Sequence, residues 1–110
     1  MKKANGNDYG SKYKDAANFS EWMCNEIIER MNSAGFTLSD WQQEGERDVY
    51  LRARVLNTSK PVQIFVYTDE VGFLFGDEWV IAENPDFPDR GTMLEWLMGQ
   101  LFLRIRPQEA

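Results

Sequence analysis

The chain has 110 residues, which suits one domain and is too short for two ordinary ones. Its 12 basic and 18 acidic side chains give a formal net charge of −6, which disfavours nucleic acid and anionic membranes as partners and favours basic proteins. The chain has no histidine and one cysteine. This excludes an intrachain disulfide, cysteine and histidine zinc sites, and catalysis by a nucleophile–histidine pair.

The first residues predict a tail rather than part of a core. Residues 1–14 contain no Leu, Ile or Val and carry four lysines against one aspartate, so we predict a flexible basic tail there. Residues 15–110 then form a single domain. Lys2 and Lys3 are followed by polar residues, and no stretch approaches the roughly 18 apolar residues that cross a bilayer. We therefore expect a cytoplasmic protein that does not contact a membrane.

A first helix is predicted over residues 19–34, because apolar residues recur there at helical spacing on one face. Asn18 and Glu21 have the spacing of a capping box at its start. Gly35 supplies its stop, since glycine adopts the left-handed conformation at no steric cost.

Five strands are predicted after this helix, separated by turn signals rich in Gly, Asn, Asp and Pro. They cover residues 36–42, 49–56, 62–68, 71–75 and 79–82. The second of them alternates most clearly between apolar and polar positions. Because short connections join neighbouring strands, we expect an antiparallel meander of four to five strands.

The alternation also predicts a register, because a slip by one residue would turn every side chain to the other face. The predicted pairs are Val55 with Val62, Ala53 with Ile64, Leu51 with Val66, Val66 with Phe73, Ile64 with Phe75, Phe75 with Trp79, and Phe73 with Ile81. One face of the sheet then collects Val, Ile, Leu, Phe and Trp side chains. The other face collects Tyr50, Arg52, Arg54, Phe65, Tyr67, Leu74 and Val80.

A second helix is predicted over residues 92–106, with a capping box formed by Thr92 and Glu95 and a stop at Pro107. It is apolar nearly all round, which indicates a buried helix. The predicted fold is therefore α+β in the order α-β-β-β-β-β-α, with both helices flanking the sheet.

Little in the chain indicates catalysis. Cys24 lies between apolar neighbours on the first helix and is expected to be an inert, partly buried thiol. Asn84, Asp86 and Glu95 stand at positions 1, 3 and 12 of a possible calcium loop, but Asp89 occupies the position that requires glycine. A magnesium site built from several carboxylates remains an alternative. Otherwise we expect no enzymatic activity, no cofactor and no metal.

Two surfaces are candidates for binding a partner. The second sheet face combines tyrosine and arginine with apolar groups, which are residue types enriched in binding hot spots. It is either a partner or homodimer interface formed by Tyr50, Arg52, Arg54, Phe65, Tyr67 and Leu74, or a core face that a helix covers.

The other candidate is an acidic patch on the predicted turns, formed by Asp69, Glu70, Asp77, Glu78, Asp86 and Asp89. Carboxylates gathered in this way can mimic nucleic-acid phosphates and occupy a basic groove of another protein. The simpler interpretation is that these residues are ordinary solvated turns.

In outline, a small acidic chain with a helix first, a sheet next and an apolar helix last resembles secretion-chaperone-type proteins and small acidic inhibitors of phage or bacterial origin. The resemblance concerns architecture and charge. It favours a non-catalytic inhibitor or immunity-type protein that masks a basic surface of a partner protein, without direct contact to nucleic acid. The alternatives are a dimeric chaperone-like protein that holds a client segment and a carboxylate-based, metal-dependent enzyme.

Overall fold

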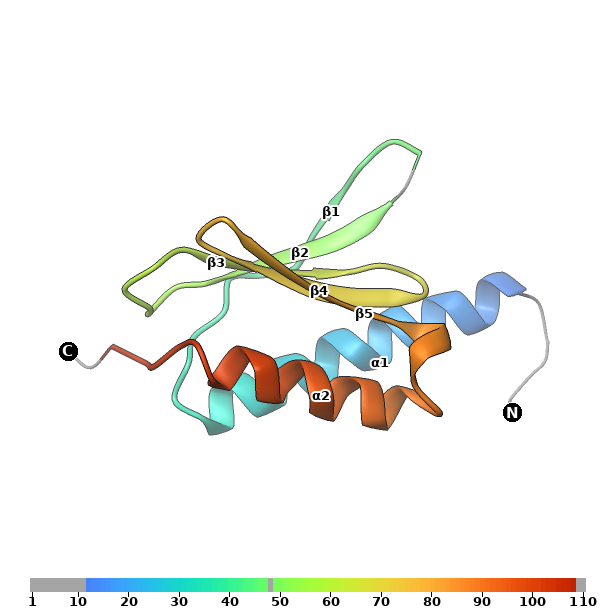
Figure 1. Cartoon of the computed structure of the whole chain (residues 1–110). Helices are drawn as coiled ribbons and strands as arrows, with labels where there is room; N and C mark the ends of the chain where they lie inside the picture. The colour runs from blue at the N-terminus through green and yellow to red at the C-terminus, as the bar shows by residue number, and fades with distance from the viewer. Residues whose placement is uncertain (1–11, 48, 109–110) are drawn as a thin grey trace.

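The computed structural model describes residues 12–47 and 49–108 and shows two helices and a five-stranded sheet (Figure 1). The elements in chain order are α1 Lys12–Ser33, β1 Gln42–Glu44, β2 Tyr50–Val55, β3 Val62–Val66, β4 Glu70–Phe75, β5 Glu78–Glu83, the short 3-10 helix η1 Asn84–Asp86, and α2 Arg90–Phe102. All neighbouring strands are antiparallel, in the spatial order β1-β2-β3-β4-β5. The predicted α+β meander with an N-terminal and a C-terminal helix is confirmed.

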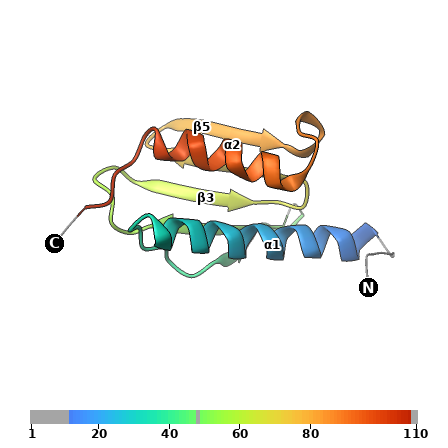
Figure 2. The ribbon, with the colours of Figure 1, turned by 90° about the horizontal axis from the view of Figure 1, so that it is seen from below.

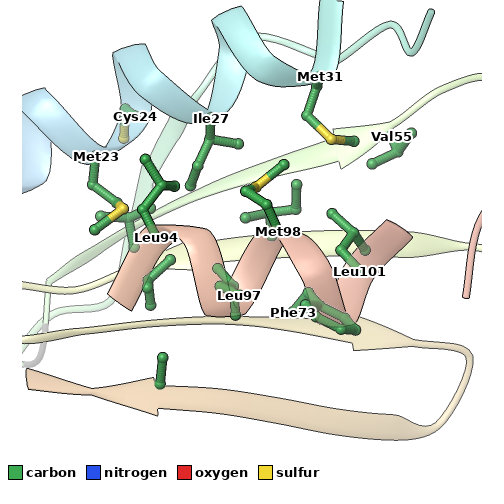
Figure 3. Packing of buried hydrophobic residues seen from close by; sticks show 14 of the residues in the cluster. Met23, Cys24, Ile27, Met31, Val55, Phe73, Leu94, Leu97, Met98 and Leu101 are labelled. Atoms are coloured by element: carbon green, nitrogen blue, oxygen red, sulfur yellow. The ribbon is translucent and has the colours of Figure 1, made fainter. Parts of the chain in front are cut away.

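Both helices lie on the same side of the sheet. They run side by side in the same direction beneath it, with β3 visible between them when the molecule is seen from below (Figure 2). The core lies between these layers, where α1 contributes Met23, Ile27 and Met31 and α2 contributes Leu94, Leu97 and Leu101 (Figure 3). The sheet contributes Val55, Val62, Ile64, Val66, Val71 and Phe73 from one face only.

The helix boundaries differ from the predicted ones. α1 begins at Lys12, so the predicted cap at Asn18 lies inside the helix, and residues 12–14 of the predicted tail belong to it. The remainder of that tail lies outside the described residues. α1 ends at Ser33, and Gly35 adopts a φ of 91°, which confirms the predicted glycine stop.

The cap of α2 is Asp89 and not Thr92. Asp89 is extended, and its carboxylate accepts a hydrogen bond of 2.7 Å from the backbone N–H of Thr92. The helix ends at Phe102, before the predicted Arg106, and the chain then turns tightly so that Ile105 reaches the core. α2 is buried along one side, whereas Trp96 on its other side is 40% exposed. Within the described residues, no helix is both long enough and apolar enough to span a bilayer.

The first strand was predicted too early. Residues 36–41 form a connection from the helix layer to the sheet, with one isolated bridge between Leu38 and Val55. Phe36 is buried and stacks on Phe102, with 5.9 Å between the ring centroids, which holds the start of this connection at the helix layer. The chain joins the sheet at Gln42.

The register confirms the prediction in one hairpin and corrects it in two. β2 and β3 pair as predicted, with Val55 opposite Val62. The β3–β4 pairing is shifted by two residues, so that Ile64 lies opposite Phe73, because a tight turn closes with a hydrogen bond from Tyr67 N–H to the Glu70 carbonyl. A shift of two keeps every side chain on its predicted face.

The β4–β5 pairing is shifted by one residue, which reverses the faces of β5. A two-residue turn at Gly76 and Asp77 places Leu74, and not Phe75, opposite Trp79. Gly76 adopts a φ of 63°, as such turns require. Trp79 and Ile81 therefore point away from the core, and Val80, predicted on the outer face, packs against the core instead.

Candidate functional site

The face of the sheet that points away from the helices is the candidate site, and we call it the open face. The alternative of a three-layer core is excluded for the described chain, because both of its helices pack on the opposite face. By strand pairing, the open face carries all six predicted residues, Tyr50, Arg52, Arg54, Phe65, Tyr67 and Leu74, together with Trp79 and Ile81. Trp79 is 54% exposed and Ile81 is 50% exposed.

An aromatic cluster forms the centre of the open face. Phe65 lies between Tyr50 and Trp79, with 5.8 Å and 5.0 Å between the ring centroids, and Tyr50 stacks on Tyr67 at 5.0 Å. The hydroxyl of Ser20 on α1 donates to the carbonyl oxygen of Tyr67 at 3.0 Å, which ties the end of this cluster to the helix layer. Phe65 is 8% exposed although no helix covers it, so its aromatic neighbours shield it from water.

A hollow of about 360 Å³ opens beside this cluster, around Gly72 of β4. It exists because Gly72, which has no side chain, lies between Phe65 of β3 and Ile81 of β5 in the sheet. Phe65, Tyr67, Glu70, Val71, Gly72, Trp79 and Ile81 line it. A β-carbon at Gly72 would lie 2.7 Å from the Val80 carbonyl oxygen, so the close approach of β5 requires glycine here.

Carboxylates surround one end of the hollow. Glu70 lines it and lies directly opposite Glu83 of β5, and Asp69 precedes Glu70 in the turn. Partial burial raises the pKa of the Glu70 carboxyl above its usual value, and the negative charges of Asp69 and Glu83 raise it further. Like charges directly opposite each other in a sheet are destabilising, which makes this end of the open face receptive to a positive charge.

A second hollow, of about 1010 Å³, lies next to the first, between the β1–β2 connection and the β3–β4 turn. Tyr67 and Glu70 line both hollows, and Val49 and Arg47 are among the other residues that line the second. A chain that binds at Gly72 therefore has room to continue over the end of the sheet.

The arginines of the open face have different roles. Arg52 forms a salt bridge with Glu44 of β1, and its guanidinium also donates to the side-chain oxygen of Gln63 at 3.1 Å. It thereby connects β1, β2 and β3. Arg54 is exposed near the end of β2.

The six predicted acidic residues do not form one patch. Asp69 and Glu70 stand at the start of β4, whereas Asp77 and Glu78 follow its end. A six-residue strand separates these groups by about 17 Å. Asp86 and Asp89 follow β5 and lie toward the same end as Asp69, where Asn84 N–H donates to the Asp69 carbonyl at 2.9 Å.

Two of these acids have structural partners. Glu78 forms a salt bridge of 2.9 Å with Arg104, and the hydrogen bonds from that guanidinium lower the pKa of the Glu78 carboxyl. Asp89 caps α2, and the hydrogen bond from the Thr92 backbone lowers the pKa of its carboxyl. Glu83 was not among the predicted acidic residues. It lies opposite Glu70 in the sheet, and its charge acts on Glu70 together with that of Asp69.

Two side chains that could have served catalysis or metal binding, Cys24 and Glu95, are buried and paired with an arginine, respectively. Cys24 is buried, and burial raises the pKa of its thiol to about 12, so the nucleophilic thiolate is suppressed. Glu95, of the possible calcium loop, forms a 2.5 Å salt bridge with Arg30 of α1. Across the described part of the chain, no three Cys, Asp or Glu side chains are grouped closely enough to hold a metal ion.

Comparison of the chain with models of known protein families, with curated proteins and with solved structures finds no match. The role of the open face therefore has to be inferred from its geometry and chemistry.

Proposed function

We propose that this protein is a non-catalytic binding module that holds a basic partner protein against its open face. The observation that carries the proposal is a sheet with both helices on one side and an aromatic cluster flanked by half-exposed Trp79 and Ile81 on the other. Exposed aromatic groups around a shielded centre are typical of binding hot spots. The carboxylates of Asp69, Glu70 and Glu83 at one end favour a partner with complementary positive charge.

A second copy of the chain is a less favourable occupant of the open face than a basic protein. Each copy carries a formal net charge of −6, so self-association brings two acidic proteins together. The alternative predicted from the sequence, a dimeric chaperone-like protein, would require the same surface. Sedimentation velocity distinguishes a homodimer from a complex with a basic partner.

Binding of a basic surface also accounts for the inhibitor or immunity-type role expected from the sequence. A partner whose basic segment is occupied by this acidic protein cannot use that segment to bind phosphate groups. With this role we expect both proteins in the cytoplasm, a reducing compartment that suits a chain with a single cysteine.

The experiment is affinity capture from the source cells with the wild-type chain and two matched variants. The variant Trp79→Ser, Ile81→Ser removes the exposed apolar groups of the open face. The control Leu103→Ser removes a side chain that is 75% exposed at the end of α2, in the helix layer. Circular dichroism shows whether each variant folds, and sedimentation velocity reports its oligomeric state.

We expect the wild type and Leu103→Ser to retain the same basic protein, and the double variant to lose it while remaining folded. Raising the salt concentration should slow formation of the complex, because screening shortens the range of attraction between charges. Equal retention by the double variant would contradict the proposal, as would a stable wild-type homodimer that the double substitution dissociates.

A further inference from the structure

We propose that the hollow at Gly72 is a receptor for one arginine side chain on the partner. This inference rests on the proposed function and adds the chemical group that is recognised. The hollow combines aromatic walls with a carboxylate at its end, and these two features are the ones that bind a guanidinium.

The shape of the hollow favours a flat, partly apolar group. Phe65 and Trp79, with their ring centroids 5.0 Å apart and their planes tilted by 42°, form one wall. Ile81 contributes an aliphatic wall and Gly72 leaves the floor open down to the backbone. An arginine stem can lie along Ile81 while its planar head stacks on an aromatic face.

The charge at the end of the hollow is uncompensated within the described chain. Glu44, Glu78 and Glu95 each form a salt bridge with an arginine, whereas no such bridge to Glu70 or Glu83 is present among the described residues. Glu70 is the carboxylate that lines the hollow, and the carboxylates of Asp69 and Glu83 lie near it.

A cation from outside would relieve this repulsion. A guanidinium carries five donors in a rigid fork and can bind two carboxylates at once, which an ammonium group does less well. The pairing of Glu70 with Glu83 across β4 and β5 presents two carboxylates to the same side of the sheet. Arginine is therefore the occupant that matches both the walls and the charge.

The test uses three synthetic pentapeptides, blocked at both ends, with serines around a central arginine, lysine or citrulline. Citrulline keeps the shape of arginine and removes its charge. Each peptide is titrated into the full 15N-labelled chain, and the shifts of the Gly72 amide and the Trp79 indole N–H are followed. Glu70→Gln removes the carboxylate in the hollow, and Asp77→Asn is the matched control at the opposite end of β4.

We expect saturable shifts at Gly72 and Trp79, with the arginine peptide binding most tightly and the citrulline peptide weakest. Glu70→Gln should weaken the arginine peptide by roughly three- to fivefold, as expected for loss of a partly exposed ion pair, and Asp77→Asn should leave it unchanged. Equal binding of arginine and citrulline, or equal effects of the two substitutions, would overturn the inference.

The two proposals fail in different ways. If Trp79→Ser with Ile81→Ser abolishes capture of the partner but the peptides show no preference for arginine, the open face is the binding surface and the arginine receptor is wrong. A further hollow lies between α1 and α2, and Glu26, Glu29 and Glu95 are among the residues that line it. If shifts induced by the arginine peptide map to that hollow, the arginine site at Gly72 is wrong.

Discussion

Replacing Gly72 with alanine tests whether β4 and β5 approach each other as closely as the structure shows. A β-carbon at this position would lie 2.7 Å from the Val80 carbonyl oxygen and 3.2 Å from Cγ1 of Ile81. The first contact involves backbone and cannot be relieved by rotating a side chain, so β5 must move. Overpacking of this kind costs about 1–3 kcal/mol. Gly72→Ala should therefore lower the free energy of unfolding by about that amount.

Gly99→Ala provides the matched control, because it is the same chemical change where nothing lies within 4 Å. Gly99 is exposed inside α2, so alanine should stabilise the helix by about 0.5–1 kcal/mol. Urea unfolding followed by tryptophan fluorescence and circular dichroism measures both changes. The two substitutions should act in opposite directions. Equal stabilisation by both would show that Gly72 is not confined by β5 and would refute the described register.

Three further predictions concern single side chains. Cys24 should react slowly with a thiol reagent in the folded protein and rapidly in urea, because burial raises its pKa to about 12; fast reaction of the folded chain would contradict its burial. Asp89→Ala should lower the melting temperature more than Thr92→Val, because the valine variant loses only the hydroxyl contact with Asp89 and keeps the capping bond from the Thr92 backbone N–H; a larger loss in Thr92→Val would favour the predicted cap at Thr92. The hydrogen bonds from Arg104 lower the pKa of Glu78 below 4.5, so they stabilise the fold above that pH and are lost as the pH falls through the lowered pKa. Glu78→Gln should therefore reduce the loss of unfolding free energy that the protein shows as the pH becomes acidic. An unchanged dependence of the unfolding free energy on pH would show that the Glu78–Arg104 pair contributes nothing to stability.

The sequence predicts strands better than it predicts the turns between them. The alternation in β2 and β3 places Val55 opposite Val62 correctly, because both strands have one apolar and one polar face. Apart from their terminal glutamates, β4 and β5 contain only apolar residues and Gly72. The sequence therefore does not show which residues face the core, and the length of the turn decides the register. Reading the Gly76 and Asp77 turn as two residues long would have placed Trp79 on the open face.

The helix boundaries show a similar limit. Asp89 and Thr92 are both good capping residues three positions apart, and local sequence does not distinguish them. In the structure Asp89 is the cap, because its backbone is extended in the segment that joins η1 to the start of α2.

The candidate site was only partly predictable for a different reason. Alternation identifies Tyr50, Phe65 and Tyr67 as neighbours on one face, but it does not say on which side two helices pack. That depends on the path of the connections, such as the segment that starts at Phe36. The acidic turns were predicted as one patch because turns attract carboxylates, whereas the antiparallel topology sends alternate turns to opposite ends of the sheet.

The central claim is that the open face, and not the helix layer, contacts the partner. Hydroxyl-radical footprinting with mass spectrometry tests it on two tryptophans of similar exposure, Trp79 on the open face at 54% and Trp96 on α2 at 40%. Both should be oxidised in the free protein. In the complex with the captured partner, Trp79 should be protected and Trp96 should remain reactive. Protection of Trp96 with Trp79 unchanged would place the partner on the helices and contradict the account.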